Sequence, residues 1–215
     1  TPFISNVVWL WDGFQWRPYT FAELTLPIGT VTSGLPYDVF LYASSGTAVS
    51  IESLAWSTAT ARATGVSIQD GRYCKTGDKT RLYVGTFLPD STTTTKMVLG
   101  STSAGAYVGV WNTYNQSERA LVVQEATNEW AYTVQTFRAA NNSTANRVTF
   151  VRGLDLNPMS CRVHAYATNT SPVNVAVGVG IDSTSVNSAL VYGGAVNSVA
   201  SVQSCQYLGF PGIGS

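Results

Sequence analysis

Apolar side chains at alternate positions are the feature of this sequence that most restricts its fold. From Val175 to Ile181, every odd position holds a β-branched apolar residue, and the positions between them hold small residues. Successive side chains of an extended strand point to opposite faces, so this pattern predicts a strand with one packed face. A surface helix would instead place apolar residues three and four positions apart.

Similar alternation recurs along the chain and predicts further strands. They are expected over residues 37–42, 48–56, 81–88, 107–111, 129–138, 147–152, 161–167, 189–192 and 199–208. Turn-forming sequences rich in Gly, Asp, Asn and Pro lie between several of them. Strands that repeat about every ten residues with such turns are typical of sandwiches and jelly rolls. We therefore expect an all-β fold, an antiparallel β-sandwich or jelly roll.

The two ends of the chain differ from its middle. The N-terminal end carries three of the six tryptophans, and a glycine turn between Trp11 and Trp16 predicts a short hairpin. The C-terminal end is apolar but rich in Gly and Pro, which predicts an extended segment. The expected organisation is an N-terminal arm or hairpin over residues 1–20, a sandwich domain over residues 21–208 and a tail over residues 209–215.

Apolar ends of this kind are a liability for a chain that exposes them to solvent. We expect both ends to dock, either on the main sheet of the chain itself or on a partner. The candidate interface residues are Trp9, Trp11, Trp16, Phe210 and Ile213.

Charge is unusually scarce in this chain. Charged residues make up 11% of the sequence, against about 25% in ordinary soluble domains, and the net charge is zero. The basic residues are scattered, which argues against the positive patch that nucleic-acid binding needs. A charge-poor surface tolerates close contact because fewer ions must be desolvated, so it favours a subunit of an assembly over a neutral secreted protein.

Neither a membrane span nor a secretory leader is predicted. No run reaches the ~20 apolar residues of a membrane-spanning helix. The first residues lack the charged and apolar regions of a signal peptide, although a mature secreted protein would look the same. We therefore expect neither a membrane nor nucleic acid as a partner.

Residues that usually carry catalysis are sparse. His164 is the only histidine, and its predicted strand places it on the face of Arg162 and Tyr166, which favours a surface role over that of a catalytic base. Glu125 and Glu129 are the only close acidic pair outside clear turns, and a glycosidase pair is the weaker interpretation of them. We expect no catalytic residues and no enzymatic activity.

Metal and cofactor sites are not predicted either. The spacing of Asp70 and Asp78 is too loose for a calcium loop, and no Cys-x-x-Cys motif is present to bind zinc. The three cysteines, Cys74, Cys161 and Cys205, are expected to be buried thiols, with one disulfide and one free thiol as the alternative.

Aromatic residues are abundant and allow two interpretations. Rings at period two are usually core residues or cross-strand pairs, so Trp111 and Trp130 are expected in the core. Exposed Trp or Tyr rings would instead stack on sugars. This alternative is the best argument in the sequence for a carbohydrate-binding surface.

Several segments occur together in a recognisable order. They are Ser33-Gly34-Leu35-Pro36-Tyr37-Asp38-Val39-Phe40-Leu41-Tyr42, Leu54-Ala55-Trp56, Ile68-Gln69-Asp70-Gly71, Lys75-Thr76-Gly77-Asp78, Arg81-Leu82-Tyr83-Val84-Gly85-Thr86-Phe87 and Trp111-Asn112-Thr113-Tyr114-Asn115. Across residues 8–185 the series resembles a domain found in virion proteins of tailed bacteriophages. The resemblance implies a virion surface protein and carries over no catalytic residues. One departure is the partly apolar segment Lys96-Met97-Val98-Leu99, which is expected to make a different contact.

A short sandwich with apolar ends suits a capsid cement or decoration protein that stabilises the head lattice. We expect a symmetric homo-oligomer, a trimer, that contacts the major capsid protein or other virion proteins through its terminal segments. A tail-fibre or tail-tip protein that binds a host surface glycan is the alternative, and a glycan depolymerase is a weaker one. The expected location is the virion, after assembly in the host cytoplasm.

Overall fold

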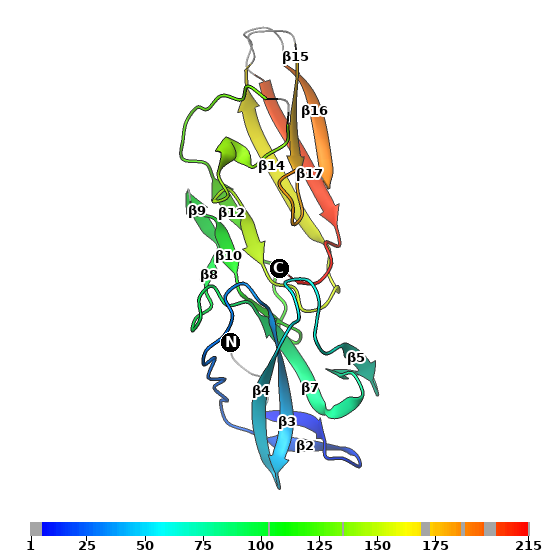
Figure 1. The fold of residues 1–215 in the computed structure, drawn as a ribbon. Coiled ribbons are helices and arrows are strands. Elements are labelled where there is room, and N and C mark those ends of the chain that lie inside the picture. Colours follow the sequence, from blue (N-terminus) through cyan, green and yellow to red (C-terminus); the bar gives the residue numbers. More distant parts are fainter. Residues whose placement is uncertain are drawn as a thin grey trace. The chain divides into compact units, whose positions relative to one another are not determined.

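A computed structural model describes residues 6–102, 104–134, 136–168, 173–185, 188–195 and 201–214 (Figure 1). These residues form strands and loops, with one short 3-10 helix, η1 (Ala140–Asn142), and no α-helix among them. Most strand pairs are antiparallel, so the predicted all-β class is confirmed, while the jelly-roll topology stays a prediction. Within the described ranges, no helix is both long and apolar enough to cross a membrane.

The chain folds into two compact units. The first unit comprises residues 1–123, 148–154 and 213–215, and the second unit comprises residues 124–147 and 155–212. The sequence predicted one sandwich domain over residues 21–208, and the structure divides these residues between both units. Alternation indicates which strands have a packed face, but not which strands share a core.

The main sheet of the first unit has the strand order β4-β3-β7-β6-β5, and β11 also pairs with β7. Its strands are β3 (Tyr37–Ser45), β4 (Ala48–Ala55), β5 (Val66–Gln69), β6 (Arg72–Lys75), β7 (Asp78–Phe87) and β11 (Val110–Asn112). Neighbouring strands of this sheet run antiparallel. The β3–β4 hairpin confirms the two strands predicted on either side of the turn at Gly46.

Short strands form two smaller sheets, and one of these sheets contains the predicted strand over residues 107–111 only in part. The strands are β8 (Met97–Val98), β9 (Gly100–Thr102), β10 (Ala106–Val108), β12 (Val122–Gln124) and β13 (Val148–Phe150). The chain leaves β10 at Gly109 and continues in β11, which belongs to the main sheet. A Cβ at Gly109 would overlap the Thr95 hydroxyl and lie 2.8 Å from the Leu88 carbonyl oxygen. Glycine therefore allows the close backbone approach at which the chain changes sheets.

The predicted N-terminal hairpin is present as β1 (Val7–Trp11) and β2 (Trp16–Thr20). The Asp12 carboxylate accepts hydrogen bonds from the backbone N–H groups of Phe14 and Gln15, at 2.8 Å each, and Gly13 has a φ of +106°. Leu10 and Tyr19 pack with Cys74 and Leu82 in one buried cluster, so the hairpin covers part of the core of the main sheet.

A second buried cluster lies beside β7 and combines apolar with charged side chains. Phe40, Tyr83 and Leu154 form its apolar part. Arg62 donates to both carboxylate oxygens of Asp38, at 2.6 and 3.1 Å, and the two side chains are only 9% and 3% exposed. This bidentate pair is a buried ion pair inside the first unit.

Four long strands form the regular part of the second unit. They are β14 (Met159–Ala167), β15 (Val173–Val179), β16 (Ala189–Ala195) and β17 (Ser201–Gly209). β14 pairs with β17 and β15 with β16, both antiparallel. Predicted strands over residues 161–167, 189–192 and 199–208 correspond to β14, β16 and β17, although β17 begins at Ser201 and the two residues before it lie outside the described part of the chain.

The strand predicted over residues 129–138 is wrong. In the described part of this segment the chain forms a loop without regular structure. Trp130, Tyr132 and Val134 alternate as they would in a strand, but no neighbouring strand provides a ladder for them.

Candidate functional site: the aromatic loop

The loop formed by residues 125–134 and 136–146 of the second unit, here called the aromatic loop, is fastened at its base by a carboxylate. Glu125 accepts a hydrogen bond from the Thr127 N–H at 2.8 Å and another from the Asn146 side-chain amide. The same Asn146 amide donates to the Ala140 carbonyl at 2.9 Å. These donors, that of Asn146 foremost, lower the pKa of Glu125 from 4.5 to about 2. The base of the loop is thus a hydrogen-bonded clamp that requires an ionised Glu125.

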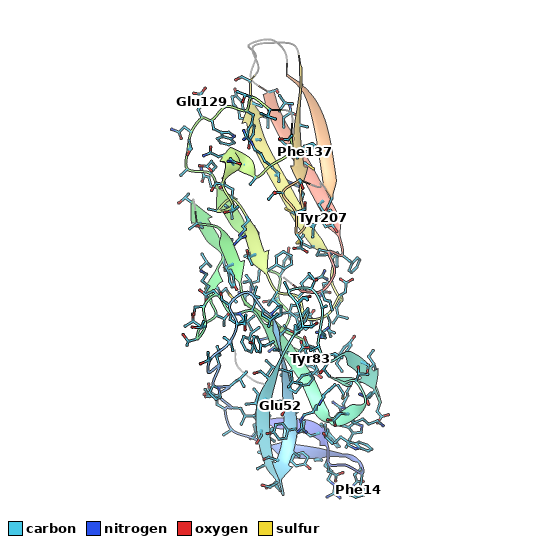
Figure 2. All side chains as sticks on the ribbon, in the orientation of Figure 1. Phe14, Glu52, Tyr83, Glu129, Phe137 and Tyr207 are labelled. Carbon is cyan, nitrogen blue, oxygen red and sulfur yellow. The ribbon has the colours of Figure 1, made fainter. Side chains whose placement is uncertain are left out.

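Beyond this clamp the loop exposes large apolar side chains. The exposed fractions are 38% for Trp130, 47% for Tyr132, 60% for Val134 and 36% for Phe137. Figure 2 labels Glu129 and Phe137 of this loop. The prediction that Trp130 belongs to the core is therefore wrong, because its segment joins no sheet. Trp111, in contrast, is half-buried against the Phe40–Tyr83 cluster.

One arginine is held against an aromatic ring of this loop. The guanidinium carbon of Arg138 lies 3.8 Å from the ring centroid of Tyr132, whose hydroxyl donates to the Ala139 carbonyl at 2.8 Å. The Nε atom of Arg138 is buried without a hydrogen-bond partner. Among the described residues no carboxylate is bound to this guanidinium. The site thus combines exposed rings, which can stack on the C–H faces of a sugar, with a positioned cation.

The N-terminal hairpin uses two of its tryptophans internally. The rings of Trp11 and Trp16 meet edge to face at 5.7 Å, with Lys79 above Trp11 and Arg72 above Trp16. Asp70 accepts from Trp16 at 3.1 Å and from Lys79 at 2.7 Å, and these bonds, that of Lys79 foremost, lower its pKa. Trp11 and Trp16 therefore fasten the hairpin to the main sheet.

Two other side chains of this hairpin remain open to solvent. Trp9 is 46% exposed and Phe14, at the hairpin tip in Figure 2, is 88% exposed. Of the five candidate interface residues predicted from the sequence, Trp9 and Phe210 are exposed, whereas Trp11, Trp16 and Ile213 are half-buried.

The C-terminal tail docks on the chain itself at its last described residue. Gly214 donates to the Arg152 carbonyl at 3.0 Å and accepts from its N–H at 2.9 Å, so the two residues form an antiparallel bridge. A Cβ at Gly214 would overlap the Ala59 carbonyl oxygen, and its φ is +110°. The tail was expected to dock either on the chain itself or on a partner, and Gly214 docks on the first unit of the chain itself.

The candidate catalytic side chains are not assembled into a site. His164 is exposed on β14 beside Arg162 and Tyr166, as predicted, and its cross-strand neighbour is Ser204. Glu125 is bonded to Thr127 and Asn146, and Glu129 is exposed.

The candidate metal and redox side chains are also dispersed. Asp70 pairs with Lys79 at 2.7 Å and Asp78 pairs with Lys75 at 3.8 Å, in separate ion pairs. The structure holds no group of three or more His, Cys, Asp or Glu in metal-binding position within the residues it describes. All three thiols are free. Cys74 and Cys205 are buried, Cys161 is half-buried, and burial raises the pKa of Cys74 to about 11.

Comparisons with protein-family models, with curated proteins and with solved structures find no match for this chain. The function is therefore argued from its residues and their geometry. Sequence reasoning had singled out Trp130 and Tyr132 but placed them on a strand. It did not connect Arg138 with them, although a spacing of six residues would place Arg138 and Tyr132 on one face of the predicted strand.

Proposed function

We propose that this chain is a non-catalytic binding protein on the surface of a bacteriophage virion, and that its aromatic loop binds bacterial surface glycans. The exposed Trp130, Tyr132 and Phe137 on a hydrogen-bonded loop are the observation that carries this proposal. The virion location rests on the resemblance of residues 8–185 to a phage virion domain and on the scarcity of charge.

The size and composition of the loop favour a binding role. Loops longer than about 12–15 residues without regular structure are uncommon in compact domains and are usually functional or disordered. This loop has a fixed base, because Glu125 and Asn146 join its two ends. Large rings that remain in water cost solubility, so their clustering on a fixed loop marks a surface that another molecule covers. Sugars present apolar C–H faces that match such rings.

Binding of the purified chain to immobilised surface polysaccharide of the host bacterium tests the proposal. Trp130→Ala and Tyr132→Ala should each weaken binding about tenfold or more, because each removes a stacking surface. Tyr166→Ala is the matched control, since Tyr166 is 73% exposed in the same unit but lies on β14. Equal binding by all three variants, or loss of binding in the Tyr166 variant alone, would contradict the proposal.

A capsid cement protein is the second candidate, favoured by the exposed apolar side chains of the N-terminal hairpin. Trp9 and Phe14 lie on a hairpin that is fastened to its own sheet through its other side chains, which leaves these two free to contact a neighbouring subunit. Copies of the chain, in a symmetric trimer, would then bridge major capsid proteins and stabilise the assembled lattice by mass action.

Light scattering and capsid melting distinguish the two candidates. A cement protein should form a stable oligomer, bind empty capsids and raise their melting temperature, and Trp9→Ala combined with Phe14→Ala should abolish these effects. A glycan-binding protein should keep its polysaccharide affinity in the same double variant.

A further inference from the structure

We infer that the ligand of the aromatic loop is an acidic saccharide, whose carboxylate binds Arg138 while its sugar ring lies against the exposed aromatic side chains. This inference rests on the proposed glycan-binding function and narrows the class of ligand. It is argued from two observations: Arg138 stacks on the ring of Tyr132, and no carboxylate of the described residues binds its guanidinium.

Arg138 is a cation whose position is set but whose hydrogen-bonding capacity is left unused. The ring of Tyr132 lies 3.8 Å from its guanidinium carbon, and the Tyr132 hydroxyl is in turn bonded to the Ala139 carbonyl, so the ring on which Arg138 stacks is held in place. A guanidinium has five N–H donors, and no acceptor for them is found among the described residues. A planar cation held this way is preorganised for an acceptor from outside.

The burial of Nε shows which edge of the Arg138 guanidinium such an acceptor cannot reach. Its Nε atom is enclosed by the protein, whereas the side chain as a whole is only half-buried. The remaining edge, formed by the two terminal nitrogens, presents parallel N–H groups at the spacing of the two oxygens of a carboxylate.

The acidic side chains of the loop leave this position open to a ligand. Glu125 belongs to the base of the loop, and its carboxylate accepts hydrogen bonds from Thr127 and Asn146. Glu129 is exposed, and no ion pair joins it to Arg138 in the described part of the chain. A carboxylate on the ligand can therefore bind Arg138 without displacing an ion pair between described residues.

The aromatic side chains define the rest of the ligand. Trp130, Tyr132 and Phe137 fall within eight residues of Arg138, and each exposes more than a third of its surface. A uronic or a sialic acid has a sugar ring with apolar C–H faces and one carboxylate. Its sugar ring can stack on the aromatic side chains while its carboxylate binds Arg138. A neutral sugar would use only the rings.

The experiment compares oligogalacturonate and oligosialic acid with their methyl esters, which keep the sugar rings but lose the charge. We expect calorimetry to show about tenfold tighter binding of at least one acid than of its ester, because the ester cannot form the charge-assisted pair. Arg138→Gln should weaken binding of the acid far more than binding of the ester and so remove the preference, and Arg138→Lys should retain part of it. Trp130→Ala should weaken acid and ester alike.

The possible failures separate the inference from the proposed function. Equal affinity for acid and ester in the unmodified chain would overturn the acidic-ligand inference but not glycan binding. An equal loss of acid and ester affinity in Arg138→Gln would show that Arg138 only supports the loop, which also overturns the inference. If the polysaccharide assay with Trp130→Ala and Tyr132→Ala shows no effect, the proposed function itself fails.

Discussion

Two arginines of this protein, one in each unit, are held against tyrosines in different surroundings. In the first unit, Arg62 lies 5.5 Å from the ring of Tyr83, and in the second, Arg138 lies 3.8 Å from the ring of Tyr132. Arg62 also binds both oxygens of Asp38 and the Gly153 carbonyl. Arg138 has no such acceptor among the described residues.

The first pair belongs to a closed network. The Tyr83 hydroxyl is bonded to the Thr86 hydroxyl at 2.6 Å, and Thr86 donates to Asp38 at 2.7 Å. Burial, above all, raises the pKa of Tyr83, so its hydroxyl stays protonated. Arg62, which binds acceptors supplied by the fold, holds the core together. Arg138, which has no acceptor among the described residues, is the arginine that we propose for a ligand.

The largest expected effect comes from opening the closed network. Arg62→Gln would leave Asp38 buried without its cation, and breaking a buried ion pair costs about 3–5 kcal/mol. The free energy of unfolding, measured by urea titration with tryptophan fluorescence, should fall by this amount. A loss below about 1 kcal/mol would mean that water or another cation replaces Arg62, and the contrast between the two pairs would be lost.

A smaller effect is expected from crowding the same network. A Cβ at Gly153 would overlap the hydroxyls of Tyr83 and Thr86 and lie 2.7 Å from the Trp111 ring. Gly153→Ala should therefore cost about 1–3 kcal/mol of unfolding free energy, the usual range for overpacking a core. Gly100→Ala is the control, because its Cβ would meet only the Val122 carbonyl, at 4.0 Å. If both variants lose similar amounts of unfolding free energy, the loss comes from replacing a glycine and not from crowding the network.

The same substitution in the open pair should barely affect stability. Arg138→Gln removes a half-buried cation that has no described acceptor, so the unfolding free energy should change by less than about 0.5 kcal/mol. Urea titration alongside Arg62→Gln measures the contrast directly. A loss comparable to that of Arg62→Gln would mean that Arg138 is structural.

Acidification should loosen the aromatic loop without unfolding the protein. The pKa of Glu125 is about 2 in the folded chain and 4.5 without its partners, so the clamp stabilises the loop above pH 4.5 and is lost as the pH falls towards 2. Hydrogen-exchange protection of the Thr127 amide, which donates to Glu125, should fall over this interval. Glu125→Gln should show low protection at every pH, whereas constant protection in the unmodified chain would contradict the clamp.

Local features of the fold could be predicted because their causes lie close together in the sequence. The β3–β4 hairpin follows from two alternating runs on either side of Gly46, and the N-terminal hairpin follows from Asp12 and Gly13. Alternation over residues 161–167 likewise predicted the exposed face of β14 that carries His164.

The candidate site could be predicted only in part. Trp130 and Tyr132 lie in an alternating segment that predicted a strand, but a strand also needs a neighbour, and none of the described strands pairs with this segment. Whether an aromatic ring is core or surface depends on what packs against it, and that is not encoded in the segment itself. The stack of Arg138 on Tyr132 is a consequence of the loop path.

The sequence by itself determined that this chain is all-β, where its main hairpins form, and that its surface carries few charges. These properties depend on residue type and short-range periodicity. Only the tertiary structure decided that two units share the chain, that β10 and β13 pair in parallel, and that Arg62 reaches Asp38 across 24 positions while Arg138 finds no acid among the described residues. Such contacts depend on which distant segments pack together. A side chain is stabilised by a partner far away in the sequence only after the fold has brought the two residues close to each other.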